Sequence, residues 1–89
     1  MNDAKPSDFT HEFEEIVTSL SDVLGKEYTD IWIEHWRHGE STLALENLIN
    51  NLTEIEPSLT KEMQERIASL AQYDKDLLAE FRESYPEMG

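Results

Sequence analysis

The sequence predicts an all-α fold, a single small bundle of four helices near residues 8–24, 27–37, 42–55 and 61–83. Three observations lead to this prediction. Apolar residues recur every three or four positions, as they do on one face of an α-helix. No stretch sustains the alternation of apolar and polar residues that a half-buried strand requires. The connecting segments 37–41 and 56–60 are short, so neighbouring helices should pack roughly antiparallel.

The length of the chain allows one domain with one core, because it has only 89 residues. We expect residues 1–7 to be a flexible tail, 8–86 the helical domain and 87–89 a flexible end. The net charge of -13 could also indicate disorder, but 38% of the residues are hydrophobic and they recur at regular intervals. The chain should therefore fold.

The first helix should begin at a cap, Ser7 or Asp8, and end at Gly25, since glycine readily takes the left-handed conformation that follows a helix. Its apolar stripe consists of Phe9, Phe13, Ile16, Val17, Leu20 and Leu24. The second helix should end at Gly39. One stripe of it carries Tyr28, Ile31, Trp32, His35 and Trp36. Two tryptophans four positions apart on a short helix are more often core anchors than an exposed binding hot spot.

The third helix should be capped by Ser41 and closed by Pro57, since a residue before proline is pushed out of helical geometry. Its stripe consists of Leu45, Leu48, Ile49, Leu52 and, at its end, Ile55. Thr60 should cap the fourth helix, whose stripe consists of Met63, Ile67, Leu70, Ala71, Leu77, Leu78 and Phe81. Asp74 falls on that stripe. We favour one long helix with a kink, and the alternative is a break near Tyr73 with Asp74 capping a fifth helix.

No combination of residues points to catalysis, a cofactor or a metal. The absence of cysteine excludes thiolate metal sites and a cysteine nucleophile. His35 and His38 point in different directions, whereas a single metal needs three or four converging ligands. There is no glycine-rich phosphate loop and no Gly-x-Ser-x-Gly elbow. We therefore expect a protein that is not an enzyme and binds no cofactor.

The charge balance is strongly acidic, with twenty Asp and Glu against seven Lys and Arg. Such a surface repels nucleic acid and anionic lipid and attracts basic proteins at long range. The cations are scattered and flanked by acids, as Arg66 is by Glu62 and Glu65, and should form helix-surface pairs at three- and four-residue spacing. No apolar run approaches the roughly 20 residues of a membrane span, and no signal peptide is apparent. We expect a cytoplasmic protein, monomeric or a small homo-oligomer, that binds neither membranes nor nucleic acid directly.

The acids cluster where cations are missing, between Lys5 and Lys26 and again between Arg37 and Lys61. Two interpretations stay open: each acidic stripe is the solvated face of an amphipathic helix, or the stripes form an anionic patch for a basic protein. The second is favoured by like charges at helical spacing, such as Asp30 and Glu34, which destabilise an isolated helix. The partner-binding residues would then be Glu27, Asp30, Glu34, Glu40, Glu46, Glu54 and Glu56.

The stretch from His38 to Leu48, HGESTLALENL, resembles the HGE…LALE.L segment of small bacterial immunity proteins of the MafI type. The likeness covers residues 35–72, more loosely beyond Leu48. Members of that family take part in contact-dependent growth inhibition systems and neutralise polymorphic toxins by binding the toxic domain. The resemblance implies that the partner is the toxic C-terminal domain of a secreted toxin, and it assigns no binding residues.

These observations lead to two hypotheses about function. The first is an immunity protein that binds and neutralises a cognate bacterial toxin, for example a nuclease, by occluding its basic active-site surface. The second is an acidic helical adaptor, regulatory subunit or nucleic-acid mimic that binds a basic host protein. Both predict that the exposed acids matter, but only the first predicts that binding abolishes a toxic activity.

Overall fold

A computed structural model describes residues 9–86 of the chain, and within this range it contains helices and no strands. The elements are α1 (Thr10–Ser19), α2 (Ser21–Leu24), α3 (Lys26–Arg37), α4 (Ser41–Ile55), α5 (Lys61–Ala71) and α6 (Lys75–Ser84). The predicted all-α bundle is confirmed. The flexible segments expected at 1–7 and 87–89, and the expected caps Ser7 and Asp8, lie outside the described residues.

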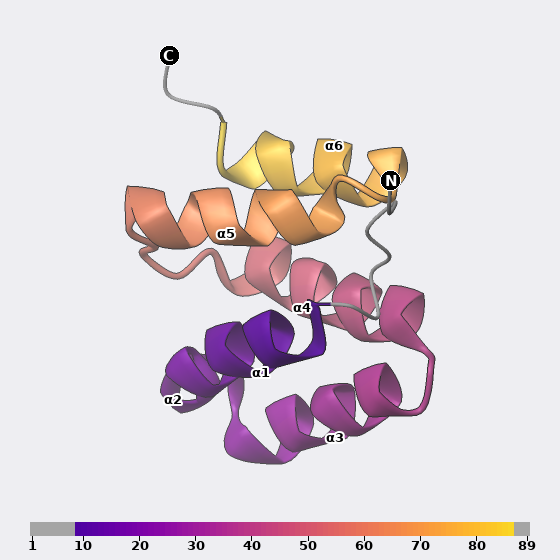
Figure 1. The fold of residues 1–89 in the computed structure, drawn as a ribbon. Coiled ribbons are helices and arrows are strands. Elements are labelled where there is room, and N and C mark those ends of the chain that lie inside the picture. Colours follow the sequence, from indigo (N-terminus) through magenta and orange to yellow (C-terminus); the bar gives the residue numbers. More distant parts are fainter. Residues whose placement is uncertain (1–8, 87–89) are drawn as a thin grey trace.

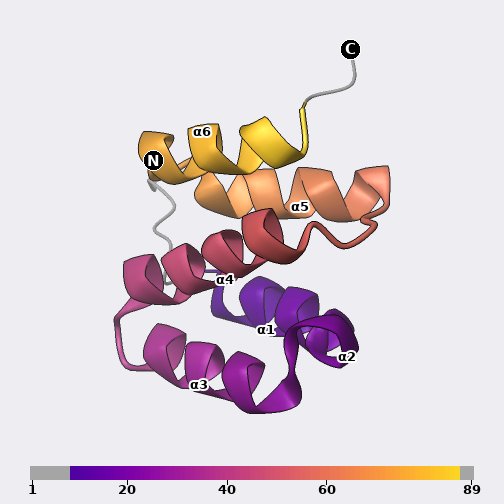
Figure 2. The same ribbon diagram turned by 180° about the vertical axis from the view of Figure 1, so that it is seen from behind.

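Five of the helices form a closed ring, which Figures 1 and 2 show from opposite sides. α1 packs on α3, α3 on α4, α4 on α6, α6 on α5, and α5 on α1, while the short α2 packs on α1 and α3. Neighbours in the ring run antiparallel except α4 and α6, which run parallel, because five helices cannot alternate all the way round. None of these helices is both long and apolar enough to cross a membrane.

The core lies inside this ring and contains most of the predicted apolar stripes. Among its fully buried side chains are Phe13, Leu48 and Phe81. Trp32 and Trp36 are also buried, and Trp36 stacks on Phe13 with 4.3 Å between the ring centroids. The two tryptophans are therefore core anchors and are not part of an exposed hot spot.

The first predicted helix is interrupted at Leu20, which divides it into α1 and α2. Two serine hydroxyls flank the break. Ser19 donates to the carbonyl of Glu15 at 2.8 Å, and Ser21 donates to that of Thr18 at 2.9 Å. Such hydrogen bonds to preceding carbonyls compete with the helical ladder and often bend helices. α2 then ends before Gly25, which has a φ of 98° in the positive region that glycine favours.

The prediction of one long helix over residues 61–83 is wrong, because the chain breaks at 72–74 and starts again as α6. Asp74 has extended backbone, and its carboxylate accepts hydrogen bonds from the N–H groups of Asp76 at 3.1 Å and Leu77 at 3.2 Å. The charge that looked out of place on an apolar stripe is a helix cap. At the start of α5, the predicted cap Thr60 is confirmed by a hydrogen bond from the Met63 N–H.

The ends of α4 differ from the prediction in detail. Its N-cap position is Glu40, and Ser41 is the first helical residue and makes no side-chain cap. The helix closes before Pro57 as expected, but Glu56 takes the left-handed conformation, with a φ of 49°. The hydroxyl of Tyr85, after α6, donates to the Pro57 carbonyl at 2.5 Å. This hydrogen bond ties the segment between α4 and α5 to the end of α6.

Candidate functional site

The acids of α1 are engaged by arginines from two other helices. Arg37 on α3 binds Glu14 through two nearly parallel hydrogen bonds, of 2.8 and 2.9 Å. Arg66 on α5 contacts both carboxylate oxygens of Glu12 and donates to Glu15 at 2.8 Å. The predicted pairing of Arg66 with its neighbours on α5 is therefore wrong. The acids of α1 fasten it to α3 and α5 and do not form a free anionic patch.

These contacts also keep the two carboxylates ionised. The hydrogen bond from Arg66 lowers the pKa of Glu12, and the hydrogen bond from Arg37 lowers the pKa of Glu14. Reciprocally, the carboxylates raise the pKa of both guanidinium groups above their ordinary value. A two-pronged pair between Arg and a carboxylate also fixes geometry, so these pairs help to set how α1 sits against its neighbours.

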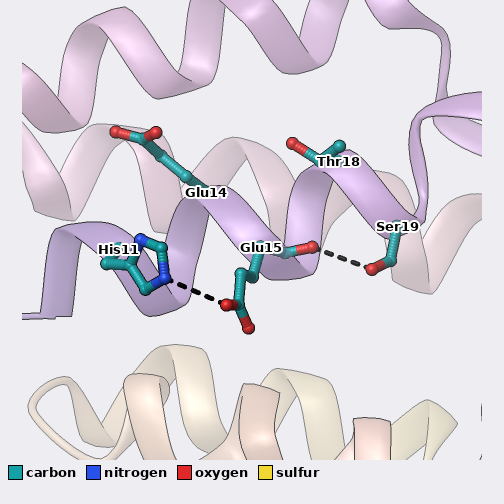
Figure 3. Close-up of a pocket in the computed structure, with 5 residues that line it drawn as sticks. All are labelled: His11, Glu14, Glu15, Thr18 and Ser19. Atoms are coloured by element: carbon teal, nitrogen blue, oxygen red, sulfur yellow. Dashed lines mark hydrogen bonds and ion pairs between the residues drawn. The ribbon is translucent and has the colours of Figure 1, made fainter.

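A groove runs along the outer side of α1 and is lined by His11, Glu14, Glu15, Thr18 and Ser19. Figure 3 shows that all five side chains come from this one helix. His11 Nε2 lies 3.0 Å from a Glu15 carboxylate oxygen. Glu15 also accepts from Arg66, and Glu14 is held by Arg37. The charged groups of the groove are thus already engaged by other parts of the protein.

The seven acids predicted to bind a partner are all exposed, and they lie on α3, on α4 and at the two ends of α4. Three of them contact a nearby base: Asp30 lies 2.8 Å from Lys26, Glu34 lies 3.3 Å from His38, and Glu40 lies 3.4 Å from His35. Across residues 9–86, no ion pair engages the other four, which are Glu27, Glu46, Glu54 and Glu56. The structure therefore divides the predicted set into locally compensated and uncompensated carboxylates.

The outer face of α4 is acidic and free of Lys and Arg. The inner face of this helix buries Ala44, Leu45, Leu48, Ile49 and Leu52. The opposite face presents Leu43, Glu46, Asn50 and Glu54, all exposed. No Lys or Arg occurs between Arg37 and Lys61, so the charges of Glu46 and Glu54 are not balanced within the helix.

α3 and α4 form an antiparallel hairpin, and the two helices lie closest at the turn and spread apart toward the start of α3 and the end of α4 (Figures 1 and 2). Arg37 marks the side of α3 that faces α1, because it pairs with Glu14. At about 100° per residue, Tyr28 and Ile31 lie about 120–180° round the helix from Arg37, away from the side that faces α1. Their exposed fractions are 60% and 52%, and that of Leu43 on α4 is 38%.

We call this region the α3–α4 surface. It consists of apolar Tyr28, Ile31 and Leu43 with acidic Glu27, Glu34, Glu46 and Glu54. The sequence predicted the acids but assigned Tyr28 and Ile31 to the core, which is wrong. Residue spacing alone could not show that the two side chains are exposed, since both lie at the edge of the stripe that Trp32 and Trp36 define.

His35 and His38 contact different carboxylates, Glu40 and Glu34 respectively. Within residues 9–86 there is no group of three or more His, Cys, Asp or Glu side chains arranged to hold a metal ion. Comparisons of the chain with known protein families, with curated proteins and with solved structures find no match. The α3–α4 surface is accordingly the candidate site on the strength of its own residues.

Proposed function

We propose that this chain is an immunity protein that binds and neutralises a cognate bacterial toxin through the α3–α4 surface. The observation that carries the proposal is that the arginines pair with acids of α1 while several acids of α3 and α4 have no cation as partner. Arg37 and Arg66 are engaged with the acids of α1, while Glu27, Glu46 and Glu54 on α3 and α4 form no ion pair within the described range. These three unpaired carboxylates give the hairpin a negative charge where it faces solvent.

Such a field favours a basic protein as partner. Complementary charge steers the encounter and raises the association rate, an effect that salt screens over roughly 10 Å at 0.1 M ionic strength. A nuclease is the toxin class that fits best, because a groove that binds a polyanionic substrate must itself be basic. An acidic surface seated on or beside that groove would exclude RNA or DNA, giving inhibition at one immunity protein per toxin.

The resemblance to MafI-type proteins supports the proposed class of function, although it assigns no binding residues. The segment that carries it, residues 38–48, comprises the turn after α3 and the first half of α4. It includes Leu43 and Glu46, both on the exposed face of α4. The likeness is strongest on the hairpin from which the acids project and continues more loosely through α5.

We expect the gene next to that of this chain to encode a toxin domain, and the test is whether this chain neutralises it. We expect the purified chain to abolish its activity at a one-to-one ratio and to protect cells that express it. A chain that binds the domain and leaves its activity intact would contradict neutralisation and favour the acidic adaptor.

A triple charge reversal locates the surface. Glu27→Lys, Glu46→Lys and Glu54→Lys should slow association at low salt by about tenfold or more, because electrostatic steering changes on-rates by 10- to 1,000-fold. The matched control reverses Glu65, Asp76 and Glu83 on α5 and α6. Each set changes the net charge equally and includes one first-turn acid, Glu27 in α3 and Asp76 in α6. Equal slowing by both sets would mean that net charge alone matters and that the α3–α4 surface is not the site.

A further inference from the structure

The exposed large apolar residues of the described chain are unevenly distributed. They are Val23, Tyr28, Ile31, Leu43, Ile55 and Tyr73. Tyr28, Ile31 and Leu43 belong to the α3–α4 surface, and Ile55 is the last residue of α4. Single exposed apolar residues are ordinary, but a group rimmed by polar residues is typical of a protein interaction site. Four of the six lie on one helical hairpin.

The arrangement on this hairpin matches the anatomy of a protein interface. Interfaces have an apolar centre surrounded by a polar rim, and tyrosine is enriched among the residues that contribute most binding energy. Here Tyr28 and Ile31, one turn apart on α3, are accompanied along that helix by Glu27 and Glu34. On α4, Leu43 precedes Glu46 by one turn.

We propose that Tyr28, Ile31 and Leu43 are the apolar anchor of the α3–α4 surface, and that its occupant is a basic protein segment whose Lys and Arg side chains surround an apolar centre. This inference rests on the proposed function, since it takes a basic protein as partner. It adds a division of roles. The acids raise the association rate by attracting the partner. The apolar anchor lowers the dissociation rate, because buried contacts act mainly on that rate.

The negative charge of the α3–α4 surface favours a basic protein segment over a second copy of the chain as its occupant. Self-association through the α3–α4 surface would bring the same acids of two chains together, each chain with a net charge of -13. Like charges facing each other across an interface are strongly unfavourable. An anionic lipid surface is disfavoured for the same reason. A cationic segment instead gains from Glu27, Glu46 and Glu54, whose charges are uncompensated among residues 9–86.

The experiment measures binding of the full chain to three synthetic helical peptides of equal length. One has Lys on one face and Leu on the other, the second has Lys and Ser, and the third has Glu and Leu. We expect the Lys/Leu peptide to bind at least about tenfold more tightly than the Lys/Ser peptide, and the Glu/Leu peptide not to bind. Equal affinity for the two Lys peptides would overturn the anchor.

The variant Tyr28→Ser/Ile31→Ser should lose about tenfold or more in affinity for the Lys/Leu peptide, mainly through faster dissociation. Its matched control is Val23→Ser/Tyr73→Ser, which removes the same kinds of exposed side chain from elsewhere and should change affinity less than about twofold. Because all four side chains are at least 40% exposed, both variants should keep their helical spectrum. Leu43→Ser provides a second test on α4 and should weaken binding in the same direction. Equal loss in variant and control would contradict the proposal.

Two further measurements separate this inference from the proposed function. Sedimentation should show the same mass for the wild type and for Tyr28→Ser/Ile31→Ser, whereas a dimer that the variant abolishes would make a second copy the occupant and overturn the inference. In the toxin assay, the variant Tyr28→Ser/Ile31→Ser could neutralise the toxin fully and dissociate from it at an unchanged rate. That result would contradict the inference about the anchor and leave the proposed function intact. Peptide discrimination as expected, without any neutralisation, would remove only the proposed function.

Discussion

Arg66 on α5 contacts both carboxylate oxygens of Glu12 on α1, a residue 54 positions earlier in the chain. The same guanidinium reaches Glu15, so one cation holds two acids of one helix. Together with the pair of Arg37 and Glu14, this contact joins α1 to both α3 and α5. The acids of α1, which form an anionic stripe in the sequence, are therefore engaged in holding three helices together. Arg37 belongs to α3 and donates both hydrogen bonds to Glu14 on α1, while Glu27, Glu46 and Glu54 of the hairpin form no ion pair within residues 9–86.

The first prediction concerns Arg66→Gln. The substitution leaves Glu12 and Glu15 close together without their cation, so we expect the free energy of unfolding to fall by about 1 kcal/mol, a value limited by the partial exposure of the pair. Urea denaturation measures it. Lys61→Gln is the control, since Lys61 is exposed and belongs to no ion pair with any residue in 9–86. An equal loss in both variants would assign the effect to net charge.

The second prediction concerns pH and Glu12→Gln. Because Arg66 lowers the pKa of Glu12 in the folded state, the pair stabilises the fold above the unfolded pKa, and this contribution is lost as pH falls through the folded value. The difference in stability between wild type and Glu12→Gln should be constant from neutral pH to about pH 5 and should vanish well below about pH 4. Comparing the two proteins at each pH cancels the general relief of charge repulsion in acid. A difference that grows on acidification would contradict the pairing.

The third prediction concerns the cap of α6. Asp74→Ala removes the acceptor of two N–H groups and a negative charge at a helix N-terminus, so it should cost about 1 kcal/mol and fray the start of α6. Asp74→Asn keeps an acceptor and should recover most of that loss. Thermal unfolding and amide hydrogen exchange at residues 75–78 measure the two effects. Unchanged exchange in Asp74→Ala would contradict the capping role of Asp74.

The fold was largely predictable because its signals are local. Gly25 and Gly39 follow helix ends, and Thr60 begins one, since each supplies a conformation or a hydrogen bond that a helix terminus needs. The break at Asp74 was one of two open alternatives, because an aspartate at the edge of an apolar stripe fits a kinked helix as well as a cap. Only the extended backbone at Asp74 decides between them.

The candidate site was predictable in its charges and not in its apolar centre. The exposed carboxylates follow from composition and helical periodicity. The ring of helices brings Arg66 on α5 to the acids of α1. Spacing along α5 cannot reveal this contact, so the sequence alone does not show which carboxylates are compensated. The same limit explains Tyr28 and Ile31. Only a narrow side of α3 is buried, the side that carries Thr29, Trp32 and Trp36. How wide the buried side is depends on how the neighbouring helices pack against α3.

The fourth prediction concerns Glu56, the one described residue other than glycine with a positive φ. An L-residue pays about 1–2 kcal/mol for the left-handed conformation, whereas glycine adopts it without this penalty. Glu56→Gly should therefore stabilise the fold by roughly 0.5–1 kcal/mol, the gain being reduced because glycine also makes the unfolded chain more flexible. Glu56→Gln serves as the control, since it removes the charge and keeps the strain. If Glu56→Gln stabilises the protein as much as Glu56→Gly, the gain comes from charge. If Glu56→Gly destabilises it, the side chain at this position contributes more than the backbone conformation costs.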